Sequence, residues 1–156
     1  STCGIVPAIR RLKAERLMIN MALSLHAPND ALRRKIMPIA NKYSLDQIFQ
    51  ALKEYYSEGR RRLTFEYSLI KGVNDSDSCA RQLAERLRGF NCLVNLIPVN
   101  PVRERKFTSP GRVEAIAFQK KLENYGINVT IRREMGRDID GACGQLRKRY
   151  LETDNV

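Results

Sequence analysis

Residues 63–97, LTFEYSLIKGVNDSDSCARQLAERLRGFNCLVNLI, contain the pattern that decides the fold. Alternating apolar residues over 63–70 and a mostly apolar run over 92–97 each predict a strand. Between them, a Gly-containing turn at 72–75 precedes a helical pattern that Gly89 ends. Two such strands joined by a helix predict a parallel pair with a right-handed crossover.

The flanking sequence continues the same alternation of helix and strand. Further helices are expected at 5–16, at 29–36 with Asn29 as cap, after the capping box of residues 44–47, and after Ser109-Pro110 with Val113, Ile116 and Ala117 facing inward. Further strands are expected at 18–24 and 127–131. The fold class is therefore α/β, a parallel sheet with crossover helices. Four strands are too few to close a barrel, so the sequence predicts either an open sheet or an incomplete barrel.

Composition narrows the class of protein. The net charge of +11 comes from clustered Lys and Arg, which favours a polyanionic partner such as nucleic acid over a merely solvated surface. The hydrophobic fraction of 43% excludes a disordered chain, and no apolar run is long enough for a membrane helix. The four cysteines are far apart, which argues against a zinc site or a disulfide framework and favours the reducing cytoplasm. The start at Ser1-Thr2-Cys3-Gly4 resembles a processed or truncated chain.

Unusual polar residues follow the expected strands, where parallel α/β folds bind ligands. His26 follows the first strand, the turn at 72–75 follows the second, Asn100 follows the third, and residues 136–146 follow the fourth. We therefore expect the functional groups to share the carboxyl edge of the sheet.

Motifs at these places resemble one known family. They are STCGIVP from Ser1, SLHAPND from Ser24, TFEY from Thr64, GVND from Gly72, VNLIPVNP from Val94 and DIDGACGQL from Asp138. In this order and over residues 1–146 they are similar to the RlmN/Cfr family of radical S-adenosylmethionine (SAM) RNA methyltransferases. The chain departs from the usual family pattern at Cys3, at Gly141 and at residues 134–137.

The resemblance implies a function and a fold for the longer protein. It implies the C-terminal half of a partial (β/α) barrel over residues 1–146, with a flexible tail at 147–156. The activity implied is methylation of C2 of adenosine in 23S rRNA and tRNA through an S-methylcysteine. A [4Fe–4S] cluster and an electron donor such as flavodoxin are implied for the full-length enzyme, with the cluster ligands outside this chain. Two alternatives stay open: an inactive basic fragment that only binds RNA or SAM, and a Cfr-like enzyme that methylates C8.

The resemblance also assigns roles to particular residues. It makes Cys143 the catalytic cysteine that takes a methyl group from SAM, although spacing alone favours an inert thiol. It assigns SAM binding to five further residues: Ser1, Ser24, Leu25, His26 and Asn100. No metal ligand is assigned.

Other polar residues and thiols receive less specific interpretations. Asp138 and Asp140 fit turn or capping roles better than acid–base chemistry. Glu66, in the middle of a strand, either faces a cavity or pairs with an arginine. Cys79 and Cys92 are expected to be packing residues.

Overall fold

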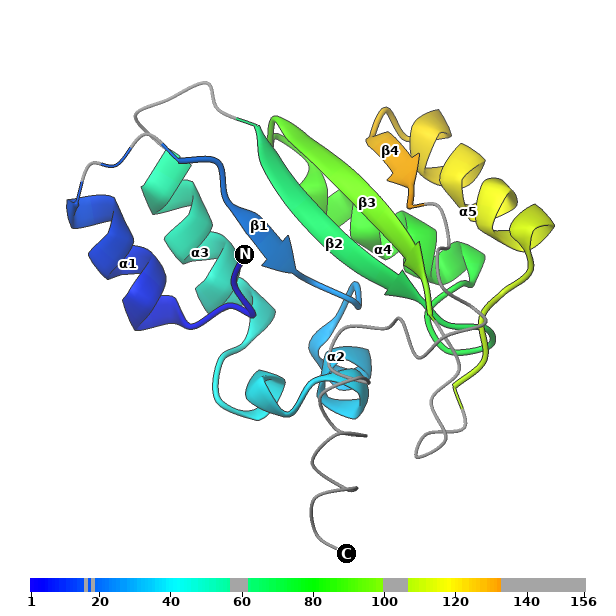
Figure 1. Ribbon diagram of the computed structural model, residues 1–156, viewed down its shortest axis with the longest axis horizontal. Helices are drawn as coiled ribbons and strands as arrows, with labels where there is room; N and C mark the ends of the chain where they lie inside the picture. Colours follow the sequence, from blue (N-terminus) through cyan, green and yellow to red (C-terminus); the bar gives the residue numbers. More distant parts are fainter. Residues whose placement is uncertain (16, 18, 57–61, 100–106, 133–156) are drawn as a thin grey trace, which may run out of the picture.

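The computed structural model describes residues 1–15, 17, 19–56, 62–99 and 107–132, and confirms the α/β class (Figure 1). Its sheet contains β1 (Ala22–Ser24), β2 (Leu63–Leu69), β3 (Cys92–Pro98) and β4 (Asn128–Ile131). All neighbouring strands are parallel, and their order in the sheet is β1-β2-β3-β4. The helices are α1 (Val6–Ala14), α2 (Asp30–Ile36), α3 (Leu45–Tyr56), α4 (Asp77–Leu87) and α5 (Arg112–Asn124), with a short 3-10 turn at Pro38–Asn41.

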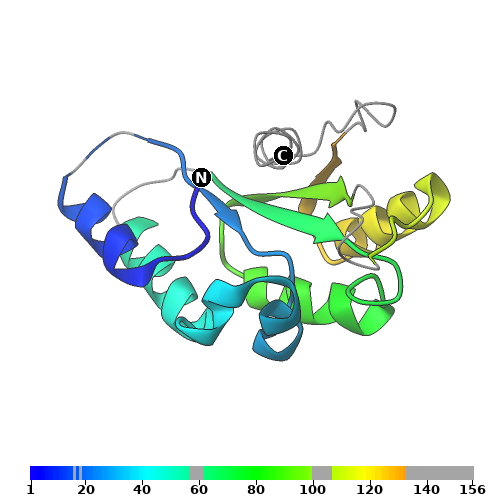
Figure 2. The ribbon, with the colours of Figure 1, turned by 60° about the horizontal axis from the view of Figure 1, so that its bottom comes forward.

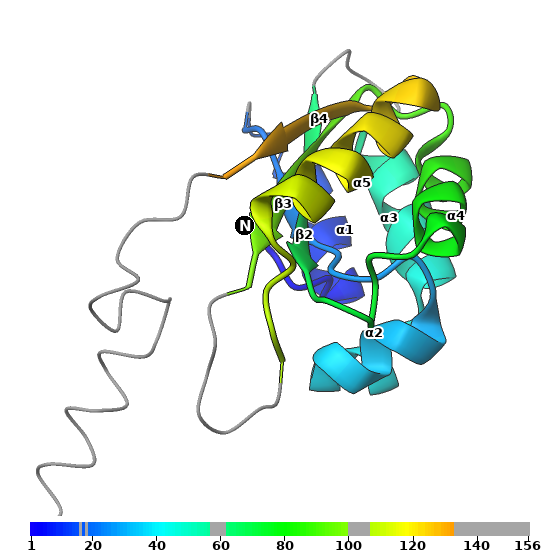
Figure 3. The same cartoon turned by 90° about the vertical axis from the view of Figure 1, so that its right-hand side faces the viewer.

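The described helices lie on one side of the sheet (Figures 2 and 3). Aromatic stacking holds the helices against the sheet. Phe49 of α3 stacks on Phe65 of β2 with ring centroids 5.5 Å apart. Likewise Tyr67 of β2 stacks on Phe118 of α5 at 5.7 Å. Every second residue of β2 is buried against this layer, from Leu63 to Leu69. The core therefore sits between one face of the sheet and its helices.

Polar side chains begin the helices as the sequence predicts. Asn29 accepts a hydrogen bond from the Leu32 N–H at 2.9 Å. Ser44 and Gln47 form the reciprocal capping box, with bonds of 3.3 and 3.0 Å. These caps stabilise helix ends whose first N–H groups have no partner within the helix.

The first strand is shorter than predicted. The expectation of a strand over 18–24 is wrong in its first half, because β1 begins at Ala22, opposite Thr64 of β2. Residues 19–21 are in no strand, and the last backbone bond before β1 runs from the Thr64 N–H to the Met21 carbonyl at 3.0 Å. Leu17 and Ile19 are accordingly 53% and 42% exposed.

The buried face of α5 also differs from the prediction. Its cap residue is Gly111, and its inward stripe is Ala115, Phe118 and Leu122 rather than Val113, Ile116 and Ala117. The larger Phe118 and Leu122 occupy the inward face because their burial removes more apolar area from water. Val113 is left 78% exposed.

The outer edge of β1 is occupied at one position. Thr2 makes a parallel bridge to Leu23, with its N–H donating to the Ala22 carbonyl at 2.9 Å. The Ser24 N–H in turn donates to the Thr2 carbonyl at 2.9 Å. Thr2 thus pairs with the outer edge of β1 as an isolated bridge. Among the described residues, no helix is long and apolar enough to cross a membrane.

Candidate functional site

One face of the sheet carries polar side chains and no described helix covers it (Figure 2). Parallel sheets are usually buried and apolar on both faces. Here the alternation in β2 places Thr64, Glu66 and Ser68 on the face opposite the core, each only half-buried. We call this surface the open face. Its polar character marks it as the candidate functional site.

A row of polar residues crosses the open face at one level. The register pairs Ser24 with Glu66, Glu66 with Asn95, and Asn95 with Thr130. The Ser24 hydroxyl donates to the Glu66 carboxylate at 3.2 Å, and the Thr130 hydroxyl lies 3.4 Å from the Asn95 amide oxygen. Neighbouring strands thus contribute adjacent hydroxyl, carboxylate and amide groups. Glu66 faces the open side, and among the described residues it forms no ion pair with an arginine.

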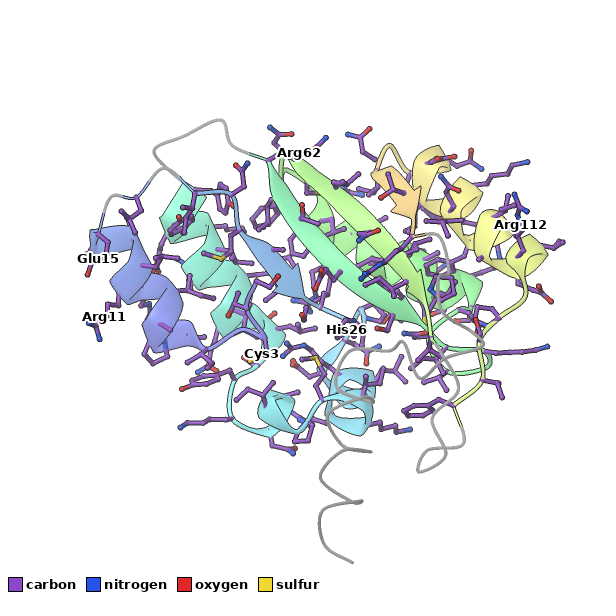
Figure 4. All side chains as sticks on the ribbon, in the orientation of Figure 1. Cys3, Arg11, Glu15, His26, Arg62 and Arg112 are labelled. Carbon is purple, nitrogen blue, oxygen red and sulfur yellow. The ribbon has the colours of Figure 1, made fainter. Side chains whose placement is uncertain are left out.

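His26 lies just beyond β1 in a constrained conformation (Figure 4). Its backbone φ of 58° is in the left-handed region, which disfavours side chains other than glycine. The imidazole Nδ1 accepts a hydrogen bond from the Ser68 N–H at 3.0 Å. Burial lowers the pKa of His26 to about 4. At neutral pH the ring is therefore uncharged, and with Nδ1 as acceptor its proton sits on Nε2 as a donor.

Asn74 holds the His26 loop against the end of β2. Its side chain is fully buried and donates from Nδ2 to the carbonyls of His26 at 2.8 Å and Ser68 at 2.7 Å. Its Oδ1 accepts from the Ile70 N–H at 2.7 Å. The Asn74 carbonyl accepts from the Tyr67 hydroxyl at 2.7 Å. Asn74 thereby supports the unusual backbone conformation of His26.

Arg33 supports the same loop from α2, and its placement corrects an expectation. The sequence groups it with Arg34 and Lys35 as a surface basic cluster, yet its side chain is completely buried. It donates to the carbonyls of Leu25 at 3.1 Å, Ser24 at 3.1 Å and Cys3 at 2.8 Å. The guanidinium therefore ties residues 1–4 to the end of β1.

Some of the residues predicted to contact SAM are among the described residues, and others are not. Ser24 and His26 come together at the carboxyl end of β1, and Ser1 is exposed beside the Thr2 bridge. Leu25 points into the core, and its N–H donates to the Glu66 carbonyl at 2.9 Å. Its side chain therefore acts as a spacer between two site residues.

The remaining candidates from the sequence lie elsewhere in the chain. Asn100, Asp138, Asp140 and Cys143 are outside the described residues. Cys79 and Cys92 are buried in the core, as expected for packing residues, and burial raises the pKa of the Cys92 thiol.

A groove of about 530 Å³ lies on the other side of the sheet, among the helices. It is lined by residues of α3 and α4, including Phe49, Gln82 and Arg86. Arg86 lies over the Phe49 ring at 5.4 Å and pairs with Asp46 at 2.8 Å, so this guanidinium already has partners. Because Phe49 stacks on the core face of β2, the groove is separated from the open face by the sheet itself.

Solved structures assign this fold to a class. The chain resembles a radical SAM methyltransferase from Sphaerobacter thermophilus with a TM-score of 0.86 and 46% identity, over 92% of this chain and 42% of that one. It also resembles a domain of pyruvate-formate lyase-activating enzyme from Bacteroides vulgatus with a TM-score of 0.62, but the 16% identity there speaks for the fold alone. The fold of this chain is therefore similar to that of part of a radical SAM methyltransferase.

Sequence relatives identify the family. The chain is 59% identical over 152 residues to a protein of Lachnospira eligens named "Probable dual-specificity RNA methyltransferase RlmN", and covers 43% of it. A protein of the same name from Lachnoclostridium phytofermentans is 54% identical over 156 residues, and the chain covers 44% of it. No family model matches the chain. The chain therefore belongs to the RlmN/Cfr family of radical SAM methyltransferases and spans less than half the length of these relatives.

The open face fits SAM, whereas the described residues do not fit an iron–sulfur cluster. Ser24 offers a hydroxyl, His26 an Nε2 donor and Glu66 a carboxylate, which together suit the hydroxyl, amine and carboxylate groups of the cofactor. A [4Fe–4S] cluster needs thiolates that converge on one place. Among the described residues, no three His, Cys, Asp or Glu side chains gather where they could hold a metal.

Proposed function

We propose that this chain binds SAM on the open face of its sheet and forms part of an RNA methyltransferase. The observation that carries the proposal is the juxtaposition of Ser24, His26 and Glu66 at the carboxyl half of neighbouring parallel strands. Ligands of α/β folds bind at this edge. The net charge of +11 suits an RNA substrate, which the names of the relatives also indicate for those proteins.

In this proposal the chain positions SAM and supplies the group that receives its methyl. Bound SAM provides an electrophilic methyl group on a positively charged sulfur. Ser24, His26 and Asn100, with Ser1, orient the cofactor, and Leu25 sets the spacing between Ser24 and His26. The Cys143 thiol first loses its proton to solvent. Its sulfur then forms a bond to the methyl carbon while the bond from that carbon to the sulfonium breaks, and the electron pair stays on the leaving sulfur. The products are S-methylcysteine and neutral S-adenosylhomocysteine.

We further propose that the methyl carbon is destined for C2 of adenosine in 23S rRNA and tRNA. An aromatic C–H carbon is a poor nucleophile, so a direct methyl-cation transfer does not reach it. The longer protein would need a cluster and an electron donor such as flavodoxin for the radical step, in the reducing cytoplasm. Among the residues described, this chain contributes cofactor binding to that reaction.

The product nucleoside tests the proposed specificity. A longer protein that contains this chain, incubated with SAM and either 23S rRNA or tRNA, is expected to yield 2-methyladenosine after digestion of the RNA. Mass spectrometry against standards of 2-methyladenosine and 8-methyladenosine distinguishes the two isomers by retention time. Formation of the 8-methyl isomer would assign the protein to the Cfr-like activity. If the protein binds SAM but leaves the RNA unmodified, its function would be binding alone.

A further inference from the structure

Glu66 is a carboxylate on the open face that no described cation pairs with. The residues described include 3 ion pairs, formed by Arg10 with Glu54, Arg86 with Asp46, and Lys121 with Asp77. Glu66 belongs to none of them, although Lys and Arg total 28 in the sequence against 17 Asp and Glu. Its one side-chain hydrogen bond among the described residues comes from the uncharged Ser24 hydroxyl. A half-buried carboxylate in such a cationic chain is thus left without a described positive partner.

The neighbours of Glu66 do not neutralise it. Asn95 on β3 is an uncharged amide, and His26 beyond β1 is uncharged because burial lowers its pKa to about 4. Arg33 on α2 directs its guanidinium to the backbone carbonyls of Cys3, Ser24 and Leu25. Within the row of Ser24, Glu66, Asn95 and Thr130, Glu66 is therefore the one charged side chain. A positively charged ligand would offset this charge.

We propose that Glu66 makes this site select a cationic ligand over its neutral counterpart, so that SAM binds in preference to S-adenosylhomocysteine. This inference rests on the proposed function, since it assumes that the open face is the SAM site. The two ligands share the adenosine and the amino acid group, and differ in the methyl group that gives SAM its positive sulfur. A carboxylate in a partly desolvated site attracts that charge far more strongly than it would in bulk water.

This preference has a consequence for turnover. Methyl transfer to Cys143 converts a cationic occupant of the site into a neutral one. The attraction to Glu66 is then lost when the product, S-adenosylhomocysteine, must leave the site. A new SAM molecule that enters the site regains this attraction. Glu66 would thus favour exchange of S-adenosylhomocysteine for SAM.

A charge-removing substitution tests the inference. We would measure the Kd values of SAM and of S-adenosylhomocysteine by calorimetry for the wild-type chain and for Glu66→Gln. Glutamine keeps an oxygen that can accept the Ser24 hydroxyl, so the fold and the hydrogen bond persist. The preference for SAM is expected to fall by roughly fivefold or more, as the loss of one partly screened charge interaction requires. Glu123→Gln, which changes the net charge equally on the surface helix α5, should leave the preference unchanged.

The outcomes separate this inference from the proposed function. If the wild-type chain binds neither ligand, the proposed function fails and the inference falls with it. If the wild type binds SAM and Glu66→Gln weakens both ligands equally, the SAM site stands and charge selection by Glu66 is wrong. An unchanged affinity for both ligands in Glu66→Gln would also overturn the inference. Circular dichroism confirms that each variant is folded.

Discussion

Replacement of Cys143 by Ala is expected to abolish RNA methylation by a longer protein that contains this chain. Alanine offers no sulfur to carry the methyl group, so the loss should be complete and not a partial change in KM. The measurement is transfer of labelled methyl groups from SAM to 23S rRNA or tRNA. In the wild type, a labelled methyl should also appear on the peptide that contains Gly141, Ala142 and Cys143.

Two other cysteines provide matched controls for this prediction. Cys79 and Cys92 are buried in the core and lie away from the open face. Cys79→Ala and Cys92→Ala should retain methylation with some loss of stability, because each substitution leaves a small cavity. Normal methylation by Cys143→Ala would show that Cys143 is an inert thiol and would rule out the proposed methyl transfer to it.

Replacement of Asn74 by Leu is expected to destabilise the chain and loosen the His26 loop. The substitution removes 3 buried side-chain hydrogen bonds, to the His26 carbonyl, the Ser68 carbonyl and the Ile70 N–H. Each buried group left without a partner costs about 1–3 kcal/mol, so the free energy of unfolding should fall by roughly 3 kcal/mol or more. Urea unfolding of the chain measures this loss.

The neighbouring Asp75 is a suitable control for Asn74. Its carboxylate accepts from the Gly72 N–H at 2.9 Å at an exposed position in the same turn. Asp75→Ala should therefore cost no more than about 1 kcal/mol. Equal losses for the two variants would show that Asn74 is an ordinary turn residue without a special role in supporting His26.

Local patterns in the sequence are sufficient for most of the fold. The alternation over β2, the caps at Asn29 and Ser44, and the glycine after α4 act within a few residues, so they can be recognised without tertiary contacts. The strand expected at 18–24 fails because its length depends on where β2 begins. Helix α5 has two apolar stripes, and the spacing of its apolar residues does not show which of the two is buried.

The site is less accessible to prediction than the fold. Ser24 and His26 can be identified through the family motif that contains them, and the open face then brings them together with Glu66. Arg33 resembles a surface charge in the sequence, because its burial depends on carbonyls of residues 3, 24 and 25 converging on it. Asn74 stands in a recognised turn motif, but its bond to the His26 carbonyl joins residues 48 positions apart.

If SAM binds on the open face, the spectrum of the single histidine should change when SAM is added. His26 is the only histidine of the sequence, so an untagged, ¹⁵N-labelled chain gives one unambiguous pair of imidazole signals. Without ligand at neutral pH, they should report an uncharged ring protonated on Nε2, because Nδ1 accepts from the Ser68 N–H. Added SAM should shift the Nε2 signal progressively to saturation. If SAM binds saturably and leaves the His26 signals unmoved, while the amides of Phe49, Gln82 and Arg86 shift, then SAM binds in the helical groove and not on the open face.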